Sequence, residues 1–375
     1  MREFDVPVTL RDATRVIHAG LPAPVQGAPF LPGPVFASAF HAQGAPTDAP
    51  FAYTREGHPT WENFERALSE LEGGNATLFA SGVAAIAAVF GVALRPGDLL
   101  AIGGDAYYGA RGLAKAESEA RGIEVREVVM PAFRPADLDG ARLVWFESPS
   151  NPNLDVADVA EIVLAARERG VLVAMDNTTA TMLAQRPLQM GVDFSMMSDT
   201  KSLCGHADLL LGHVAVRDPE LHARLRDWRQ KTGAIAGPME AWLAHRSLAT
   251  LEMRLARQCD NALRIATFLA GNPAVRGVRY PGLPGDPSYA LAARQMRSFG
   301  PVLGFTLADR GAAERFLSAC RLVREATSFG GVITTAERRA RWGGDDVGEG
   351  FIRFSAGCED PDDLQVDIAQ ALART

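Results

Sequence analysis

Lysine is rare in this chain, and one of its lysines is a candidate for covalent chemistry. Only Lys115, Lys201 and Lys231 occur among the 38 basic residues, and Lys115 and Lys231 lie in charged segments where solvation is expected. Lys201 follows the apolar run FSMM, in a loop that also carries Ser198 and Thr200. A lone loop lysine is usually a solvated surface residue. A poorly solvated lysine at the end of a buried strand, however, can have a pKa low enough to attack a carbonyl carbon and form a Schiff base.

A carboxylate stands at the end of a second apolar run. Asp176 closes VLVAMD, and many residues in such a place only begin a turn or cap a helix. The functional alternative is a carboxylate that pairs with a protonated pyridine nitrogen and keeps the ring an electron sink. Because ligands of open α/β sheets bind beyond the carboxyl ends of the strands, Asp176 and Lys201 can converge on one ring.

A third element suits a phosphate group. Ser81, Gly82 and Val83 open an apolar helical run, and the first N–H groups of a helix are free to bind an anion at its positive dipole end. Many helices begin with Ser-Gly, so this signal is weak alone and counts only beside Lys201 and Asp176.

These candidates require a sheet that gathers strand ends at one edge. From about residue 61 to 233 the apolar pattern alternates between helix and strand. The runs LVWFES, VLVAMDN and FSMMSD have strand length, and VADVAEIVLAARERG predicts a helix with Val156, Val159, Ile162, Val163 and Ala166 on its apolar face. The amphipathic run ENFERALSELEGG predicts a helix that ends at Gly73-Gly74. Such alternation predicts an α/β fold with a mostly parallel, mixed sheet covered by helices on both faces.

The pattern changes twice along the chain, which predicts three parts. Residues 1–50 are rich in Pro and Gly and predict an extended N-terminal arm. Residues 51–233 form the predicted α/β domain. Residues 234–375 begin with a long helical stretch, MEAWLAHRSLATLEMRLARQCDNALRIATFLAG, and continue with the strand-like runs VLGFTLAD and FIRFSAG. This last part is expected to be a smaller C-terminal α+β domain joined by a long linking helix.

Composition excludes several classes of function. The net charge of −7 argues against a nucleic-acid surface, because such binding requires a basic face. No apolar run reaches the length of a membrane span or of a secretory signal, so a cytoplasmic protein is expected. Four cysteines, Cys204, Cys259, Cys320 and Cys358, are far apart and predict reduced thiols with neither a disulfide framework nor a metal site. The expected ligands are small molecules.

Ordered motifs over nearly the whole chain resemble those of one enzyme family. They are YTREGHPTWENFERALSELEGG, DAYYGA, FESPSNP, MDNTTA, SDTKSLCGHAD, VRYPGLPGDP, ATSFGGV and FIRFSAGCED. In this order they are similar to motifs of the Cys/Met metabolism enzymes that use pyridoxal 5'-phosphate (PLP), the cystathionine γ-synthase and γ-lyase group. The resemblance implies the PLP fold type I, like that of aspartate aminotransferase, and PLP as cofactor.

The resemblance also implies roles for individual residues. Lys201 matches the Schiff-base lysine and proton shuttle, Asp176 the pyridine partner, and Tyr108 a residue that stacks on the ring and acts in acid–base steps. The resemblance further implies that the phosphate is held by Gly82, Val83, Ser198 and Thr200. It implies that Arg353 binds the substrate α-carboxylate, and that Ser328, Asn151 and Thr327 lie near the substrate. Tyr53 and Arg55 match a pair that reaches the phosphate from a neighbouring subunit, which implies a homodimer, most often doubled into a tetramer.

Several positions depart from the family pattern at places expected to face the substrate. The usual Asn-Pro-Thr is His58-Pro59-Thr60, and the tyrosine after the lysine is Ser202. Thr327 stands where lyases acting on cystathionine commonly carry glutamate, and the arginine expected at Leu113 is displaced to Arg111. The segment TTAERRARWGGDDVGEG also differs and is expected to form a lid or an entrance loop.

The leading hypothesis is a C–S lyase of the cystathionine γ-lyase type, which eliminates a thiol to give a 2-oxo acid and ammonia. Cystathionine γ-synthase or O-acyl-homoserine sulfhydrylase chemistry, methionine γ-lyase and β-lyase activity are alternatives that use the same residues. A NAD-binding or P-loop protein is disfavoured, because no strand is followed by GxGxxG and no glycine loop precedes Lys201. A non-catalytic descendant of the fold would not require Lys201, Asp176, Tyr108 and Arg353 together.

Overall fold

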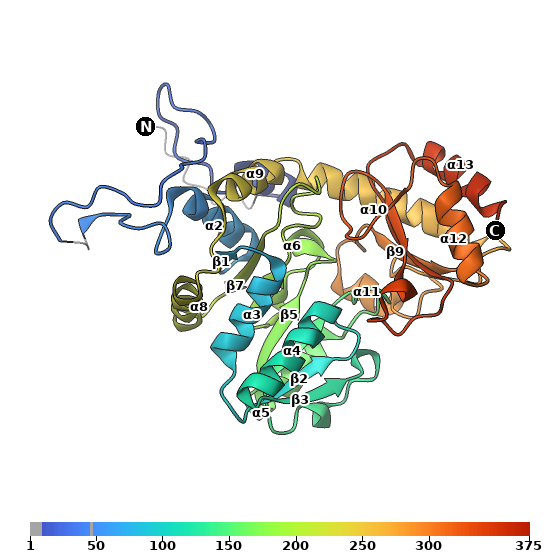
Figure 1. Cartoon of the computed structure of the whole chain (residues 1–375), viewed down its shortest axis with the longest axis horizontal. Coiled ribbons are helices and arrows are strands. Elements are labelled where there is room, and N and C mark those ends of the chain that lie inside the picture. Colours follow the sequence, from blue (N-terminus) through green and yellow to red (C-terminus); the bar gives the residue numbers. More distant parts are fainter. Residues whose placement is uncertain (1–9, 46–47) are drawn as a thin grey trace.

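A seven-stranded sheet forms the centre of the larger part of the molecule (Figure 1). The computed structural model describes residues 10–45 and 48–375. The strands of this sheet are β1 (Asn75–Phe79), β2 (Leu99–Gly103), β3 (Glu124–Val128), β4 (Ala141–Glu147), β5 (Leu172–Asp176), β6 (Phe194–Met197) and β7 (Gly212–Val216), in the order β1-β7-β6-β5-β4-β2-β3. Strand β7 pairs antiparallel with β1 and β6, and the other pairs are parallel. The predicted mixed, mostly parallel sheet is confirmed.

Helices cover both faces of this sheet because successive side chains of a strand point to opposite sides. On β4, Leu143 and Trp145 join one core, which includes helix α3, while Val144 and Phe146 join another with helix α5. The ring of Trp145 meets Phe90 of α3 edge to face at 5.3 Å. Helices α3 (Gly82–Ala93), α4 (Tyr108–Arg121) and α8 (Pro219–Thr232) lie on the first face, and α2 (Pro59–Glu72), α5 (Val159–Arg169), α6 (Thr181–Ala184) and α7 (Pro187–Met190) on the other.

Glycines and acidic residues set most helix ends. Gly73 adopts a left-handed conformation with φ of 74° after α2, as the Gly-Gly pair predicts. Helix α5 begins later than the apolar pattern indicates, because the side chain of Asp158 accepts a hydrogen bond from the N–H of Glu161 and caps the helix there. Val156 is still buried, but it packs in a small cluster with Ala180 and Ala292.

A second sheet lies in the C-terminal part, drawn in orange and red (Figure 1). Its strands are β8 (Gly277–Arg279), β9 (Val302–Thr306), β10 (Arg324–Glu325), β11 (Thr335–Arg338) and β12 (Phe351–Ser355), in the order β10-β11-β12-β9-β8. Helices α11 (Tyr289–Gln295), α12 (Arg310–Ala319) and α13 (Pro361–Leu372) accompany them. The described residues also form the 3-10 helices η2 (Met130–Ala132), η3 (Pro135–Leu138) and η4 (Arg339–Trp342).

The predicted single linking helix is two helices, α9 (Pro238–Leu248) and α10 (Leu251–Ala270). Arg254 of α10 stabilises the break between them, because its guanidinium donates to the carbonyl of Ser247 at 3.0 Å and to the hydroxyl of Thr250 at 3.1 Å. The same side chain donates to the carbonyls of Ser202 and Leu203, next to Lys201. The junction between the helices is therefore tied to the lysine loop.

The N-terminal arm projects away from the body of the molecule (Figure 1). It is not wholly extended, since helix α1 (Asp12–His18) buries Val16 against the main core. Beyond this helix, Phe30 and Phe36 are 92% and 69% exposed, which is unusual for phenylalanine. The three-part division of the chain remains a prediction.

Candidate active site

A cavity of about 370 Å³ opens at the carboxyl ends of the central strands. This volume lies within the usual range of small-ligand sites. Eleven of the residues proposed from the sequence line it: Gly82, Val83, Tyr108, Asn151, Asp176, Ser198, Thr200, Lys201, Thr327, Ser328 and Arg353. Tyr53 and Arg55 do not line it. Tyr53, just after the arm, is half exposed, and Arg55 donates to the carbonyl of Gln230.

Lys201 lies in the loop after β6 and reaches the cavity with little access to water. Its Nζ donates a 2.8 Å hydrogen bond to the hydroxyl of Ser328. Burial lowers the pKa of Lys201 to about 8, and the charge of Arg353 acts in the same direction. A lower pKa increases the share of neutral amine at physiological pH, and the neutral amine is the nucleophile.

Asp176 ends β5, the strand beside β6, so that its carboxylate faces the same cavity. Thr178 donates to Oδ1 through both its N–H, at 2.9 Å, and its hydroxyl. Burial raises the pKa of Asp176, while these hydrogen bonds and the charge of Lys201 oppose the rise. Within the described residues no hydrogen bond engages Oδ2, which leaves this oxygen for a donor in the cavity.

Helix α3 begins at the residues that were expected to form an anion cradle. The hydroxyl of Ser81 accepts from the N–H of Ala84 at 3.1 Å, so Ser81 caps the helix. A Cβ atom on Gly82 would lie 2.8 Å from the side chain of Ser198, which explains why glycine is required where the two loops meet. Val83 and Thr200 also line the cavity here. Backbone N–H groups at the start of a helix and two hydroxyls suit a phosphate group.

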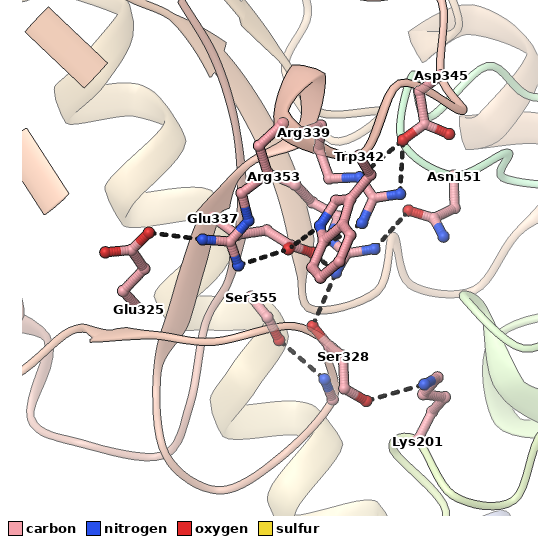
Figure 2. Close-up of polar contacts among 12 residues, drawn as sticks. Asn151, Lys201, Glu325, Ser328, Glu337, Arg339, Trp342, Asp345, Arg353 and Ser355 are labelled. Atoms are coloured by element: carbon pink, nitrogen blue, oxygen red, sulfur yellow. Dashed lines mark hydrogen bonds and ion pairs between the residues drawn. The ribbon is translucent and has the colours of Figure 1, made fainter. Parts of the chain in front are cut away.

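Arg353 of β12 reaches the cavity from the second sheet. Its guanidinium donates to Oδ1 of Asn151 at 2.8 Å and to the carbonyl of Ser328 at 3.0 Å, and it also contacts Glu337 (Figure 2). Burial lowers the pKa of Arg353 to about 10, with a further contribution from the charge of Arg339. At neutral pH the side chain therefore remains a cation in the wall of the cavity.

Among the lining residues that were not predicted from the sequence, three have ionisable side chains: Tyr107, Glu147 and Arg339. Glu147 is buried at the end of β4 and accepts from the N–H of Tyr107 at 2.9 Å. Burial and the charge of Asp176 raise its pKa well above the usual value. An acid that ends an apolar strand is the same signal that identified Asp176, so Glu147 could have been found. Tyr107 packs on Tyr108 with ring centroids 4.6 Å apart.

Three positions expected to face the substrate do not line the cavity in this chain. His58 is fully buried and caps α2, because its Nδ1 accepts from the N–H of Thr60 at 3.3 Å. Ser202 is 1% exposed, and its backbone N–H lies only 2.5 Å from where a Cβ on Gly330 would stand. Leu113 packs against the core beside α3. The departures at these three places therefore change packing within the subunit.

The segment proposed as a lid lies beside the cavity. It forms β11, η4 and a loop in which Gly344 packs against Tyr108, since a Cβ on Gly344 would lie 3.5 Å from the Cβ of Tyr108. Arg111 donates to the carbonyl of Gly344 and of Ala106. Arg111 thus supports this loop, and only Arg339 of the segment enters the lining of the cavity.

These residues fit PLP. The cavity combines a weakly basic lysine, a buried carboxylate with one free oxygen and an anion cradle, which match the aldehyde, the pyridine nitrogen and the phosphate of that cofactor. Among the described residues no helix combines the length and apolar character that a membrane span requires.

Comparisons with known proteins agree with this fit. The family model for Cys/Met metabolism PLP-dependent enzymes matches residues 13–373. A Streptomyces coelicolor protein provisionally named cystathionine gamma-lyase is 55% identical, over 97% of this chain and 94% of its own. The L-methionine gamma-lyase of Pseudomonas putida is 36% identical, over 96% of this chain and 96% of its own. The crystal structure of a cystathionine gamma synthase from Xanthomonas oryzae pv. oryzae in complex with cystathionine gives a TM-score of 0.93 at 33% identity, covering 97% of this chain and 98% of that one. The chain belongs to the Cys/Met metabolism PLP-dependent enzyme family.

Proposed function

We propose that this PLP-dependent enzyme is a C–S lyase of the cystathionine γ-lyase type. The observation that carries the proposal is the meeting of Lys201, Asp176 and Arg353 in one cavity, where Ser328 contacts both the lysine and the arginine. The overall reaction would take L-cystathionine and water to cysteine, 2-oxobutyrate and ammonia. The carbon–sulfur bond at the γ-carbon breaks, and the sulfur leaves with a proton.

Each protein group has a definite task in this scheme. When bound, PLP supplies an electron sink for the bond electrons released at the substrate α-carbon. Arg353 holds the α-carboxylate, with Asn151 and Ser328 fixing the plane of its guanidinium. Lys201 Nζ takes the α-proton and returns protons to the carbon skeleton, and Ser328 Oγ orients this amine. All the residues proposed to hold PLP line the cavity: Asp176 would hold the pyridine nitrogen, Tyr108 would stack on the ring, and Gly82, Val83, Ser198 and Thr200 would hold the phosphate.

Replacement chemistry is the main alternative. The same residues can release a leaving group from the γ-carbon and then admit a thiol, as cystathionine γ-synthase and O-acyl-homoserine sulfhydrylase do. Methionine γ-lyase action is a further candidate, because its leaving group is a small thiol. These reactions differ in the leaving group at the γ-carbon and in whether water or a thiol enters the site. The shared core residues do not distinguish them.

The working form is proposed to be a homodimer, doubled into a tetramer. Tyr53 and Arg55 lie outside the cavity of their own chain, where a neighbour's phosphate could receive them. The exposed Phe30 and Phe36 of the preceding arm support this assembly, because large exposed apolar side chains are covered at interfaces between subunits.

The first test is the reaction itself. Purified PLP-loaded enzyme is incubated with L-cystathionine, L-methionine and O-succinyl-L-homoserine with cysteine, and the keto acid and thiol products are identified. Lys201→Ala should abolish turnover, while Lys231→Ala, which removes a solvated lysine, should not. Formation of 2-oxobutyrate and cysteine supports γ-lyase action. Pyruvate with homocysteine, or net cystathionine synthesis without lyase turnover, would replace the proposal with one of its alternatives.

A further inference from the structure

Arg339 is a second arginine in the wall of the active-site cavity, beside the arginine proposed to hold the α-carboxylate. It begins η4, lines the cavity together with Arg353, and has a side chain only 3% exposed. Building on the proposed function, we propose that Arg339 binds a second carboxylate, so that the enzyme selects amino acids whose leaving side chain ends in an anionic group. Cystathionine is of this class, whereas methionine is not.

The hydrogen bonds of Arg339 hold its guanidinium in one orientation. Its Nη1 donates to Oε1 of Glu337 at 2.8 Å, its Nε donates to Oδ2 of Asp345 at 2.8 Å, and its Nη2 contacts the same oxygen (Figure 2). Glu337 and Asp345 are themselves 1% and 3% exposed. A guanidinium has more N–H donors than these three bonds use, so donors remain for a ligand.

In the cluster of Arg339, Arg353, Glu337 and Asp345 the cations line the cavity, whose opposite strand ends carry the carboxylates of Glu147 and Asp176. Arg339 and Arg353 line it, whereas their partner carboxylates Glu337 and Asp345 do not. Glu337 lies between the two arginines and contacts both, so it holds them close together without itself entering the cavity. Two fixed guanidiniums on one wall suit a ligand with two carboxylates, because each can form a charge-assisted hydrogen bond there.

Arg339 also supplies a charge that the neighbouring positions lack. Thr327 lines the cavity without a charge, and Leu113 packs against the core. The family pattern has a glutamate and an arginine at these two positions. Arg339 approaches the cavity from a different segment and places a charge in its wall.

A structural role is the competing explanation. Arg339 pairs with Glu337, and Glu337 contacts Arg353, so the loss of Arg339 could disturb the α-carboxylate site alone. That effect would weaken every amino acid substrate equally. A selective role would weaken only those with a second carboxylate, and the ratio of kcat/KM for two substrates therefore separates the explanations.

The experiment compares holoenzyme with the variant Arg339→Gln, using L-cystathionine and L-methionine as the substrate pair. We expect the ratio of kcat/KM values, cystathionine over methionine, to fall about 10- to 100-fold, as for the loss of a hydrogen bond between charged groups. The double variant Arg339→Gln with Asp345→Asn removes the cation together with one buried carboxylate and should give the same fall. This double variant replaces the single variant in the test if Arg339→Gln alone does not fold.

Arg338→Gln is the matched control. Arg338 is the adjacent residue, is equally engaged by two carboxylates, Glu349 and Glu314, and does not line the cavity. Loss of Arg338 should leave the ratio of kcat/KM values, cystathionine over methionine, unchanged. An equal fall for both substrates in Arg339→Gln, or no fall at all, would overturn the inference.

A binding measurement keeps this test separate from that of the proposed function. Isothermal titration of the holoenzyme with succinate, glutarate and adipate, and with the matching monocarboxylates, requires no turnover. At least one dicarboxylate should bind about 10-fold or more tightly than its monocarboxylate, and Arg339→Gln should remove this difference. If no sulfur amino acid is turned over but the difference exists, the proposed function fails and the anion site stands. If turnover occurs without any such difference, the anion site fails.

Discussion

Lys201 and Ser328 are joined by a 2.8 Å hydrogen bond across the boundary between the two sheets. Ser328 has a φ of 73°, a left-handed conformation that is uncommon for a residue other than glycine. In this conformation its hydroxyl accepts from the lysine while its carbonyl oxygen accepts from Arg353. Ser328 thus contacts both the amine proposed to move protons and the cation proposed to hold the substrate.

Ser328→Ala should lower kcat while PLP remains bound. The substitution removes the acceptor that orients Lys201 Nζ but leaves the carbonyl contact with Arg353 in place. A fall of about 10-fold or more is expected from the loss of one orienting hydrogen bond. Steady-state kinetics and the cofactor absorbance spectrum measure both quantities. Ser318→Ala, on the exposed side of α12, is the control, and equal kcat values for the two variants would contradict the role of Ser328.

The capture of PLP by the apoenzyme should depend on pH with an apparent pKa near 8. The pKa of Lys201 is lowered to about 8 by burial, and only the neutral amine attacks the aldehyde. About one tenth of the amine is neutral at pH 7, so the capture rate should rise with pH and level off above about pH 9. Stopped-flow absorbance from pH 6 to 10 records this profile. A rate that still rises tenfold per pH unit beyond pH 9 would mean that the pKa of Lys201 is not lowered.

Glu337→Gln should weaken every amino acid substrate, in contrast to Arg339→Gln. Glu337 contacts Arg353, accepts from Arg339 at 2.8 Å and accepts from Trp342 Nε1 at 2.8 Å. Loss of its charge leaves two buried guanidiniums with less compensation, so KM should rise and stability should fall by on the order of 3 kcal/mol. Kinetics with two substrates and urea unfolding measure these effects. Glu349→Gln removes an exposed partner of Arg338 and should change neither quantity appreciably.

His213 should make stability depend on pH on the alkaline side. It is fully buried between Asp199, at 2.7 Å from Nδ1, and Glu72, at 3.3 Å from Nε2. Burial favours the neutral ring, but the two carboxylates outweigh it and raise the pKa of His213 to about 10. A raised pKa in the folded state means that this stabilisation is complete below about pH 6.5 and is lost as the pH rises through 10.

His213→Asn should therefore destabilise the protein most at pH 6.5 and least near pH 10. The loss at the lower pH should be about 3–5 kcal/mol, because two buried carboxylates lose their cation. Urea unfolding at several pH values tests this, with the exposed His18→Asn as control. A destabilisation that is the same at every pH would show that His213 acts through packing alone.

Subunit mixing tests whether Arg55 contributes to the active site of the neighbouring subunit. Arg55→Ala and Lys201→Ala should each be inactive alone. If Arg55 serves the neighbour's site, a mixed dimer contains one site with both residues, and statistical mixing restores about one quarter of the wild-type activity. Unfolded and refolded mixtures, with each variant mixed with itself as control, measure the recovery. No recovery despite confirmed mixed dimers would place Arg55 in its own subunit's site or outside any site.

The residues at the ends of central strands could be predicted from the chain alone. Lys201 and Asp176 follow apolar runs, and the parallel order of β5 and β6 brings two such ends to one edge. The mixed sheet, the helices on both faces and the glycine of the α3 cradle follow from local patterns of the same kind. Glu147 obeys the same rule at the end of β4, so its place at this edge of the sheet was predictable in the same way.

The wall that faces the substrate could not be predicted in this way, because it forms only when the second sheet packs against the first. Asn151 follows β4, Arg353 lies on β12, and Glu337 lies on β11, yet they are linked by contacts across up to 202 residues of chain. Local periodicity places a residue on an element, but it does not determine which distant element that residue meets. The sequence therefore does not distinguish Arg339 from the other arginines of its charged segment. Only the packing of β11 and η4 beside β12 placed its guanidinium in the cavity.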